Sequence, residues 1–421
     1  MSSHVNTDHA PPLDLSKWRE VPNRLMLGGG ALAVLGIVVN AQEFAFSWLL
    51  AFMFFLSLGL GGLFLVLLHH LFDASWSVPV RRVTEAFAGL LPYMAALFLP
   101  LAVLAPKYVY PWMQKLVAGE TDHALHAKFP LFTIPMFYVV TAICFIVWTI
   151  LATQLRKWSL KQDETGSAEC TYKMRFYSAW GIFAFAFTLT LAAIMWVKAL
   201  HHQWFSTMFG VYYFAGSVWT TLATLYLVTM ILKRQGPLRE VAQEKQFYFI
   251  GSLLFAFTVF YAYIAFSQYF IIWNANMPEE TFYYVLRESG RWWNPLSWWS
   301  IGLIIIFGHF FVPFLALLRI DLKLKFGWMT PLCVWAWLMH LSDMYFNIKP
   351  VLHADGINPF WLWLDLGCLA FMGGFLAKVW LKTYYTHPAY PQRDPRFAEA
   401  MGVYVEPVSS AHPAPSHGGA K

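Results

Sequence analysis

Long apolar segments alternate with short polar segments along almost the whole chain. A helix of about 20 apolar residues crosses a hydrocarbon core of roughly 30 Å. Trp and Tyr gather at the ends of these segments, as at Trp292 and Trp293, where amphipathic rings favour the headgroup layer. The pattern predicts ten membrane-spanning helices, at residues 25–41, 47–70, 84–105, 130–154, 174–200, 209–232, 247–273, 295–318, 326–347 and 359–381.

Composition supports this all-α polytopic membrane class. Hydrophobic residues make up 58% of the 421 residues and charged residues only 12%, against roughly 25% charged in soluble domains. We therefore expect an N-terminal segment (1–24), a ten-helix transmembrane domain (25–382) and a C-terminal tail (383–421). From about residue 387 the tail is rich in Pro, His, Ser and Gly, so we expect an extended segment that could lie along a partner.

The distribution of Lys and Arg predicts the orientation in the membrane. Residues 1–24 are polar and no cleavage site follows the first apolar run, so the first helix should be retained. Of the 29 Lys and Arg residues, 22 lie on the side of both termini, and the other seven are Lys107, Lys115, Lys128, Lys198, Arg287, Arg291 and Lys349. The positive-inside rule places both termini in the cytoplasm. The net charge of +6 follows from this topology, so it does not indicate nucleic-acid binding.

A few ionisable residues lie inside the apolar segments. In "LMHLSDMYFN" (338–347), His340 and Asp343 share one helical face. Counting the rise per residue places His340 roughly 21 Å and Asp343 roughly 26 Å above the cytoplasmic end. Asp365 of the next span is then nearly level with His340. We expect a functional polar pocket formed by His340, Asp343 and Asp365, with Lys349 and Lys198 at its rim. The alternative is that Asp343 is a solvated cap at the interface.

A second polar arrangement follows the sixth span. Four hydroxyl residues follow one another at offsets of four, three and four and therefore share one helical face: Tyr213, Ser217, Thr220 and Thr224. They either conduct protons along a chain of hydroxyls and waters or simply pack against the backbone and neighbouring helices. His309 of the eighth span should lie in the inner half of the membrane, roughly 10 Å deeper than His340. Tyr261 and Gln268, with Thr258, form another polar face on the seventh span. We expect His309, Tyr261 and Gln268 to belong to the same candidate proton path as the hydroxyl residues.

The remaining candidate ligands predict no metal or haem in this chain. The four cysteines, Cys144, Cys170, Cys333 and Cys368, form no C-x-x-C pair and no zinc spacing, and Cys170 is expected in a cytoplasmic loop. A bis-histidine haem needs two histidines at one level on facing helices, and the counted depths of His309 and His340 differ.

Several long segments resemble a known family. They are "GGGALAVLGIVVNAQEFAFSWLLAFMFFLSLGLGGLFLVLLHH" (28–70), "WFSTMFGVYYFAGSVWTTLATLYLVTMILKRQGPL" (204–238), "FTVFYAYIAFSQYFIIWNANMPEET" (257–281) and "WWNPLSW" (292–298). Together they resemble the NrfD-like membrane subunits of bacterial alternative complex III, and the smaller of its two such subunits most. The resemblance covers essentially the whole chain.

The resemblance implies both an architecture and a role. It implies two four-helix bundles, spans two to five and six to nine, flanked by spans one and ten, in a bacterial inner membrane. It also implies a quinol:cytochrome c oxidoreductase in which a sister NrfD-like subunit, multihaem cytochrome c subunits and iron–sulfur subunits are the partners, with quinol as a possible substrate of this chain. On this resemblance, the pocket of His340, Asp343 and Asp365 is expected to be a quinone-binding site or an outer-side proton acceptor. A secondary transporter or a structural anchor for redox subunits stays an alternative, although Pro92, Pro100 and Pro313 are not in matched positions of two halves.

Overall fold

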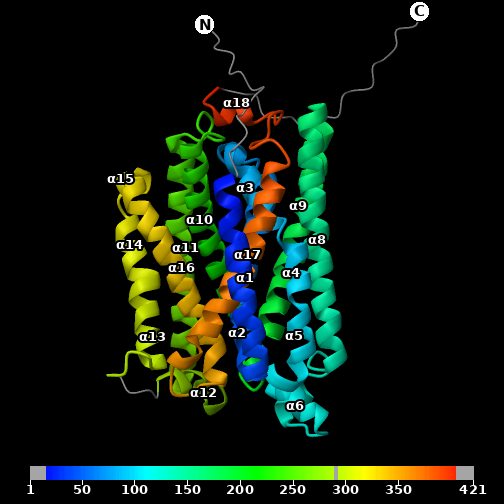
Figure 1. Cartoon of the computed structure of the whole chain (residues 1–421), viewed down its shortest axis with the longest axis vertical. Helices are drawn as coiled ribbons and strands as arrows, with labels where there is room; N and C mark the ends of the chain where they lie inside the picture. Colours follow the sequence, from blue (N-terminus) through cyan, green and yellow to red (C-terminus); the bar gives the residue numbers. More distant parts are fainter. Residues whose placement is uncertain (1–15, 289–292, 404–421) are drawn as a thin grey trace, which may run out of the picture.

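The computed structural model describes residues 16–288 and 293–403, and these residues form helices and connecting segments without strands. Nine helical segments in this part of the chain are long and apolar enough to cross a membrane. A tenth long helix, α16 (Phe326–Ile348), is not one of these nine and lies beside them (Figure 1). The expected all-α polytopic fold is therefore confirmed, while Arg291 and Trp292 lie outside the described residues.

Seven of the spans are built on single long helices. These are α1 (Ser16–Val39), α2 (Ala41–Leu71), α8 (Ile134–Thr165), α9 (Ala168–Trp196), α10 (Phe209–Gln235), α11 (Glu244–Ala275) and α17 (Leu362–Tyr385). Helices α8 and α9 are separated by only two residues, so Cys170 lies in the first turn of α9 and is buried. The expectation that Cys170 occupies a loop is wrong, because helices can extend beyond the apolar segment that marks the membrane.

Two spans are interrupted. The third consists of η1 (Ser75–Val80), α3 (Arg81–Ala88), α4 (Leu91–Leu97), α5 (Leu99–Leu104) and η2 (Ala105–Val109), and the eighth of α13 (Trp298–Ile304), η4 (Ile305–Phe311) and α14 (Val312–Leu317). In the eighth, η4 is a π-helical turn directly before Pro313. Proline lacks an N–H and clashes with the carbonyl four residues earlier, here that of His309, so the π turn accommodates the break.

Short elements connect the spans. They are α6 (Pro111–Val117), α7 (His123–Ala127), η3 (Lys198–His201), α12 (Pro278–Glu288), α15 (Ile320–Leu324), η5 (Lys349–Val351), η6 (Pro359–Trp361) and α18 (Phe397–Ala400). In Figure 1, α18 and α15 lie at one end of the helix bundle, hereafter the α18 end, and α6 and α12 lie at the other, hereafter the α12 end.

Helices α2 and α10 form the centre. In the most apolar stretch of each span, 94% of the α2 residues and 83% of the α10 residues are buried, whereas the share is 22–44% in the other spans. Those other spans therefore keep a face toward the bilayer. Helix α2 packs on α3, α9 and α10, α10 packs on α11 and α16, and α1 pairs with α17. At Gly61 of α2 a Cβ would lie 2.2 Å from Thr221 Oγ1 of α10. Glycine thus permits the close approach of α2 to α10.

Part of the C-terminal tail is packed. Helix α18 contacts η1, the ring of Phe397 stacks on Tyr390 with centroids 5.4 Å apart, and the buried carboxylate of Asp394 pairs with Arg81 and Arg396. Residues 387–403 therefore differ from the extended segment expected, because two aromatic rings and an ion-pair network hold them. The rest of the tail lies outside the described residues.

Candidate functional site

Asp343 of α16 lies at the centre of a buried polar cluster and is only 1% exposed. The hydroxyl of Tyr212 on α10 donates to Asp343 Oδ1, and the hydroxyl of Tyr261 on α11 donates to the same oxygen at 2.9 Å. The Asn347 amide donates to it at 3.2 Å. In the described part of the chain all these partners are neutral and Asp343 forms no ion pair, which is unusual for a buried carboxylate.

The Asp343 cluster continues toward the α12 end through aromatic side chains. The hydroxyl of Tyr283 on α12 donates to Asn347 Oδ1 at 2.9 Å. The Tyr283 ring stacks on Trp204 at 3.7 Å, and the Arg287 guanidinium lies 3.5 Å from the Tyr283 ring centroid. Burial lowers the pKa of Arg287 and raises the pKa of Tyr283. Arg287 is 1% exposed and donates to the backbone carbonyls of Phe346 at 2.9 Å and Asn347 at 3.5 Å, so a buried positive charge lies directly beside Asn347.

His340 is fully buried and faces α2. Its Nε2 lies 2.9 Å from Ser57 Oγ, whereas its Nδ1 has no hydrogen-bond partner among the described residues. The Nδ1 edge faces Gly216 of α10, where a Cβ would lie 3.3 Å from that nitrogen. One ring nitrogen of His340 is therefore held and the other is available.

His309 is enclosed between two aromatic rings. Its ring centroid lies 3.8 Å from that of Trp219 and 3.7 Å from that of Tyr261, and both contacts are stacked. Neither ring nitrogen of His309 has a partner in the described part of the chain. Because π turns reposition side chains, the turn before Pro313 gives a physical reason for this placement.

The two histidines have neighbours in common. His309 stacks on Tyr261, and a Cβ at Gly216 would lie 3.2 Å from His340 and 3.8 Å from Tyr261. Their spans run in opposite directions, and helical side chains lean toward their own N-terminus, so the two rings lean toward each other.

The hydroxyl stripe of α10 is tied to backbone carbonyls. Ser217, Thr220 and Thr224 each donate to the carbonyl four residues earlier, at 2.7, 2.9 and 2.7 Å. Tyr213 donates to the Met53 carbonyl of α2 at 2.8 Å. Because their protons are used in this way, none of the four donates to the next, although each oxygen can still accept.

The other residues of the seventh span have separate partners. Thr258 Oγ1 accepts from the Trp219 indole at 2.8 Å, which fixes the ring that covers His309. Gln268 lies further toward the α12 end, where Ser206 donates to it at 2.7 Å and it donates to Tyr284 at 3.0 Å. Of this face, only Tyr261 reaches Asp343.

Asp365 belongs to a second cluster. Its Oδ1 lies 2.8 Å from Lys349 Nζ, and Tyr345 donates to its Oδ2. Lys349 Nζ is also 3.8 Å from Glu43 on α2, and the other oxygen of Glu43 is 2.7 Å from His353 Nε2. The expected grouping of Asp365 with Asp343 is therefore wrong. Positions 343 and 345 point about 200° apart on a helix, so the two clusters occupy opposite faces of α16.

Lys198 lies in neither cluster. It is 7% exposed, has no hydrogen bond or ion pair within the described ranges, and its Nζ is 5.9 Å from the Phe205 ring. Burial lowers its pKa to about 7, with a further contribution from Lys128. The expectation that Lys198 borders the Asp343 site is wrong, because the segment after α9 turns toward the loop that contains Asp122 and Lys128, both of which contact His202 of that segment.

At the α18 end the ionisable residues neutralise one another. Glu85 pairs with Arg81 and Arg82, and Arg82 also pairs with Asp163 on α8. Asp394 of the tail completes the network through Arg81. No group of three or more His, Cys, Asp or Glu side chains within 16–288 and 293–403 is arranged to hold a metal ion.

Sequence reasoning missed several members of these clusters. Tyr212 adjoins Tyr213, but its partner depends on the rotation of α10 about its axis. Glu43 lies between the first two predicted spans, where charged residues are common and therefore carry little signal. Lys349, in contrast, was expected near Asp365, and the structure pairs the two.

Comparison with known proteins adds no assignment to this geometry. No model of a known protein family matches the chain, and no curated protein is detectably similar to it. The fold and the residues therefore define the class as a multi-pass helical membrane protein with a buried carboxylate site.

Proposed function

We propose that this chain is a proton-transferring membrane subunit of a quinol:acceptor oxidoreductase of the alternative complex III type. One observation carries the proposal: at membrane depth Asp343 is held by the neutral donors Tyr212, Tyr261 and Asn347, without a cation among the described residues. An intramembrane carboxylate with no charge partner is expensive, so a functional role is the favoured explanation.

Three oxygen atoms, Asp343 Oδ1 and the phenol oxygens of Tyr212 and Tyr261, can share either two or three protons. The two phenol oxygens lie 2.8 Å apart and both contact Asp343 Oδ1. With two protons, both phenols donate to the carboxylate. With a third proton on Asp343, a ring forms in which each oxygen donates to the next. The cluster can therefore accept and release a proton without losing its hydrogen bonds.

The histidines extend this cluster toward the membrane interior. His309 stacks on Tyr261 and has two unpaired ring nitrogens, and His340 has one. Neutral imidazole can accept a proton on one nitrogen and release it from the other. Water or a small side-chain rotation could link these nitrogens to the Asp343 cluster. The α10 hydroxyls Thr220 and Thr224 would then supply acceptors toward the α18 end.

Burial favours proton transfer over direct contact with quinol. Asp343 is 1% exposed and His340 is fully buried, so a quinol ring would have to displace packed side chains to reach either group. We therefore assign quinol oxidation chiefly to partner subunits, among them a sister NrfD-like chain and cytochrome c and iron–sulfur subunits. We also propose a bacterial inner membrane location with the α18 end cytoplasmic, as the positive-inside rule requires.

A transporter is less consistent with the helix breaks. They occur in the second span of the first bundle and the third span of the second, which are not corresponding positions. A structural anchor would explain the ion-pair network at the α18 end, but it gives no reason to bury Asp343 without a cation.

The test is purification of the native complex from its membrane, followed by reconstitution into liposomes. We expect haem c and iron–sulfur subunits to co-purify, and quinol oxidation to be accompanied by proton movement that His309→Leu reduces while quinol turnover persists. Met277→Leu, at an exposed site near the α12 end, is the control. Purification without redox subunits, or unchanged proton movement in His309→Leu, would contradict the proposal.

A further inference from the structure

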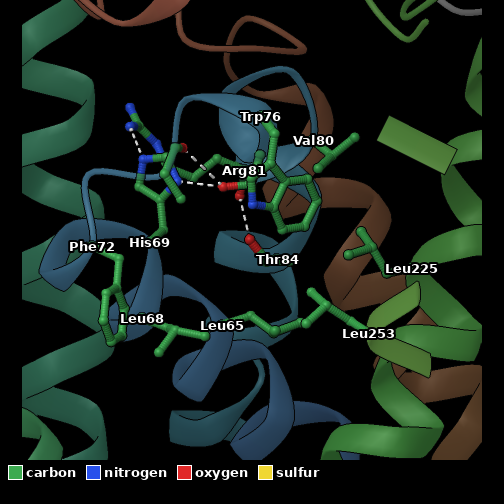
Figure 2. A pocket seen from close by; sticks show the side chains of 12 residues that line it. Leu65, Leu68, His69, Phe72, Trp76, Val80, Arg81, Thr84, Leu225 and Leu253 are labelled. Atoms are coloured by element: carbon green, nitrogen blue, oxygen red, sulfur yellow. Dashed lines mark hydrogen bonds between the residues drawn. The ribbon is translucent and has the colours of Figure 1, made fainter. Parts of the chain in front are cut away.

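A cavity of about 220 Å³ lies at the α18 end, between α2 and η1 on one side and α10 and α11 on the other (Figure 2). One helical face of α2 supplies Leu65, Leu68 and Phe72, and Leu225 and Leu253 close the opposite side. Phe72 is 74% exposed, so this edge is reachable from outside the protein. The cavity lies at the opposite end of the bundle from the Asp343–Tyr283–Arg287 chain.

The charged side chain in the wall is paired, so the wall carries no free charge. Arg81 is matched by Glu85 and Asp394. Because arginine can only donate, His69 Nε2 accepts from Arg81 at 2.9 Å, which leaves the Nδ1 proton to bond Ser77. An anionic headgroup would therefore find no unpaired cation in this wall, and the complementary ligand is neutral.

The size and lining of the cavity define the ligand further. An apolar cavity of about 150 Å³ is large enough to bind benzene, so this one has room for a substituted ring or a short hydrocarbon segment. Trp76 lines it beside Phe249, with ring centroids 5.4 Å apart, while its backbone carbonyl accepts from Gln246. The indole N–H of Trp76 donates to none of the residues that the structure describes, so it is available to a ligand oxygen.

We propose that this cavity binds the neutral, carbonyl-bearing part of a bilayer-soluble molecule, with its hydrocarbon against the leucines and its oxygen on the Trp76 indole. A quinone ring and the ester region of a glycerolipid share this chemistry. The site is separate from the Asp343 cluster, and the inference does not depend on the proposed function.

Photolabelling of the purified complex in lipid nanodiscs tests the site with two probes. One arm uses a short-chain azidobenzoquinone, and the other uses a phosphatidylethanolamine with a diazirine in its acyl chain near the ester. We expect one probe to label residues 65–84 or the segment around Leu253, and excess unlabelled compound of the same kind to suppress this labelling. The arm that labels identifies the source of the ligand.

Matched variants separate cavity binding from surface contact. Leu253→Trp fills the cavity and should reduce labelling by about tenfold or more, whereas Val259→Trp, at an exposed position of the same helix, should leave it unchanged. Trp76→Phe keeps the ring but removes the donor, so labelling should fall about threefold to tenfold, as expected for one hydrogen bond.

Several results would overturn the inference. Absence of lining labels with both probes, labelling that unlabelled compound does not suppress, or full labelling of an assembled Leu253→Trp complex would each do so. Should Leu253→Trp fail to assemble, suppression by unlabelled compound in the wild-type complex decides the question. Unchanged labelling in Trp76→Phe would refute the assigned hydrogen bond to the ligand oxygen.

Discussion

Replacement of Asp343 by Asn should remove proton exchange while keeping the fold. The amide has nearly the shape of the carboxylate, and its Oδ1 can still accept from Tyr212 and Tyr261. These bonds change from charge-assisted to neutral, which costs about 1 kcal/mol. The cost is offset because an amide is cheaper to bury than a carboxylate. The assembled complex should therefore form in normal amount.

Activity should respond far more than stability does. Loss of a group that accepts a proton, or that orients the acceptor, reduces rates by roughly 10-fold to 1000-fold. Asp343→Ala should in contrast damage the structure, because the hydroxyls of Tyr212 and Tyr261 and the Asn347 amide would lose their acceptor at about 1–3 kcal/mol each. The pair of variants separates chemistry from folding.

The assay is quinol:acceptor turnover of the purified complex per haem, together with proton release in liposomes. Asp355→Asn, which changes an exposed carboxylate of the loop after η5, is the control and should behave as wild type. His340→Leu should slow the reaction to a similar extent, and adding it to Asp343→Asn should cost little more, because residues that act together are not additive. Wild-type turnover and proton release in an assembled Asp343→Asn complex would refute the reasoning.

Three further predictions concern topology and the α12 end. In intact cells an impermeant maleimide should label Ala118→Cys but not Ala168→Cys, since the four native cysteines are buried; the opposite pattern would reverse the orientation. Lys198→Met should raise the melting temperature by several degrees at pH 6, because burial lowers the lysine pKa to about 7. Below pH 7 the buried lysine is charged, and the cost of burying that charge opposes folding in full. The gain in melting temperature should therefore fade between pH 7 and about 10, and a gain that does not depend on pH would contradict the lowered pKa of Lys198. Lys349→Met leaves the buried carboxylate of Asp365 without its cation, while Glu43 keeps His353, and it should destabilise the protein by about 3–5 kcal/mol in thermal unfolding. Lys378→Met, at an exposed site, should change stability by less than about 1 kcal/mol, and equal effects of the two variants would argue against the buried pair.

The spans could be predicted from the sequence because the bilayer imposes a length and an apolar composition on each. Their ends could not. Helix α8 continues to Thr165 and α9 starts at Ala168, since a water-exposed helix end has no hydropathy signal. The π turn before Pro313 was also beyond prediction, although the proline itself marked a break.

The site was partly visible in the sequence. His340 and Asp343 stand out because ionisable residues are rare in apolar runs. Their partners could not be named, since a tyrosine on α10 or α11 reads as an ordinary aromatic residue until the rotation of its helix is known. Asp365 of α17 was expected beside Asp343, but it contacts the opposite side of α16 and pairs with Lys349.

The sequence by itself determined the class of this protein, the number and approximate position of its spans, and which buried groups are ionisable. These properties are local along the chain, because each run of residues meets the bilayer independently. Only the tertiary structure decided that Asp343 faces Tyr212 and Tyr261 while Asp365 faces Lys349. Those pairings depend on how neighbouring helices rotate and pack, which is a property of the whole bundle and is absent from any single span.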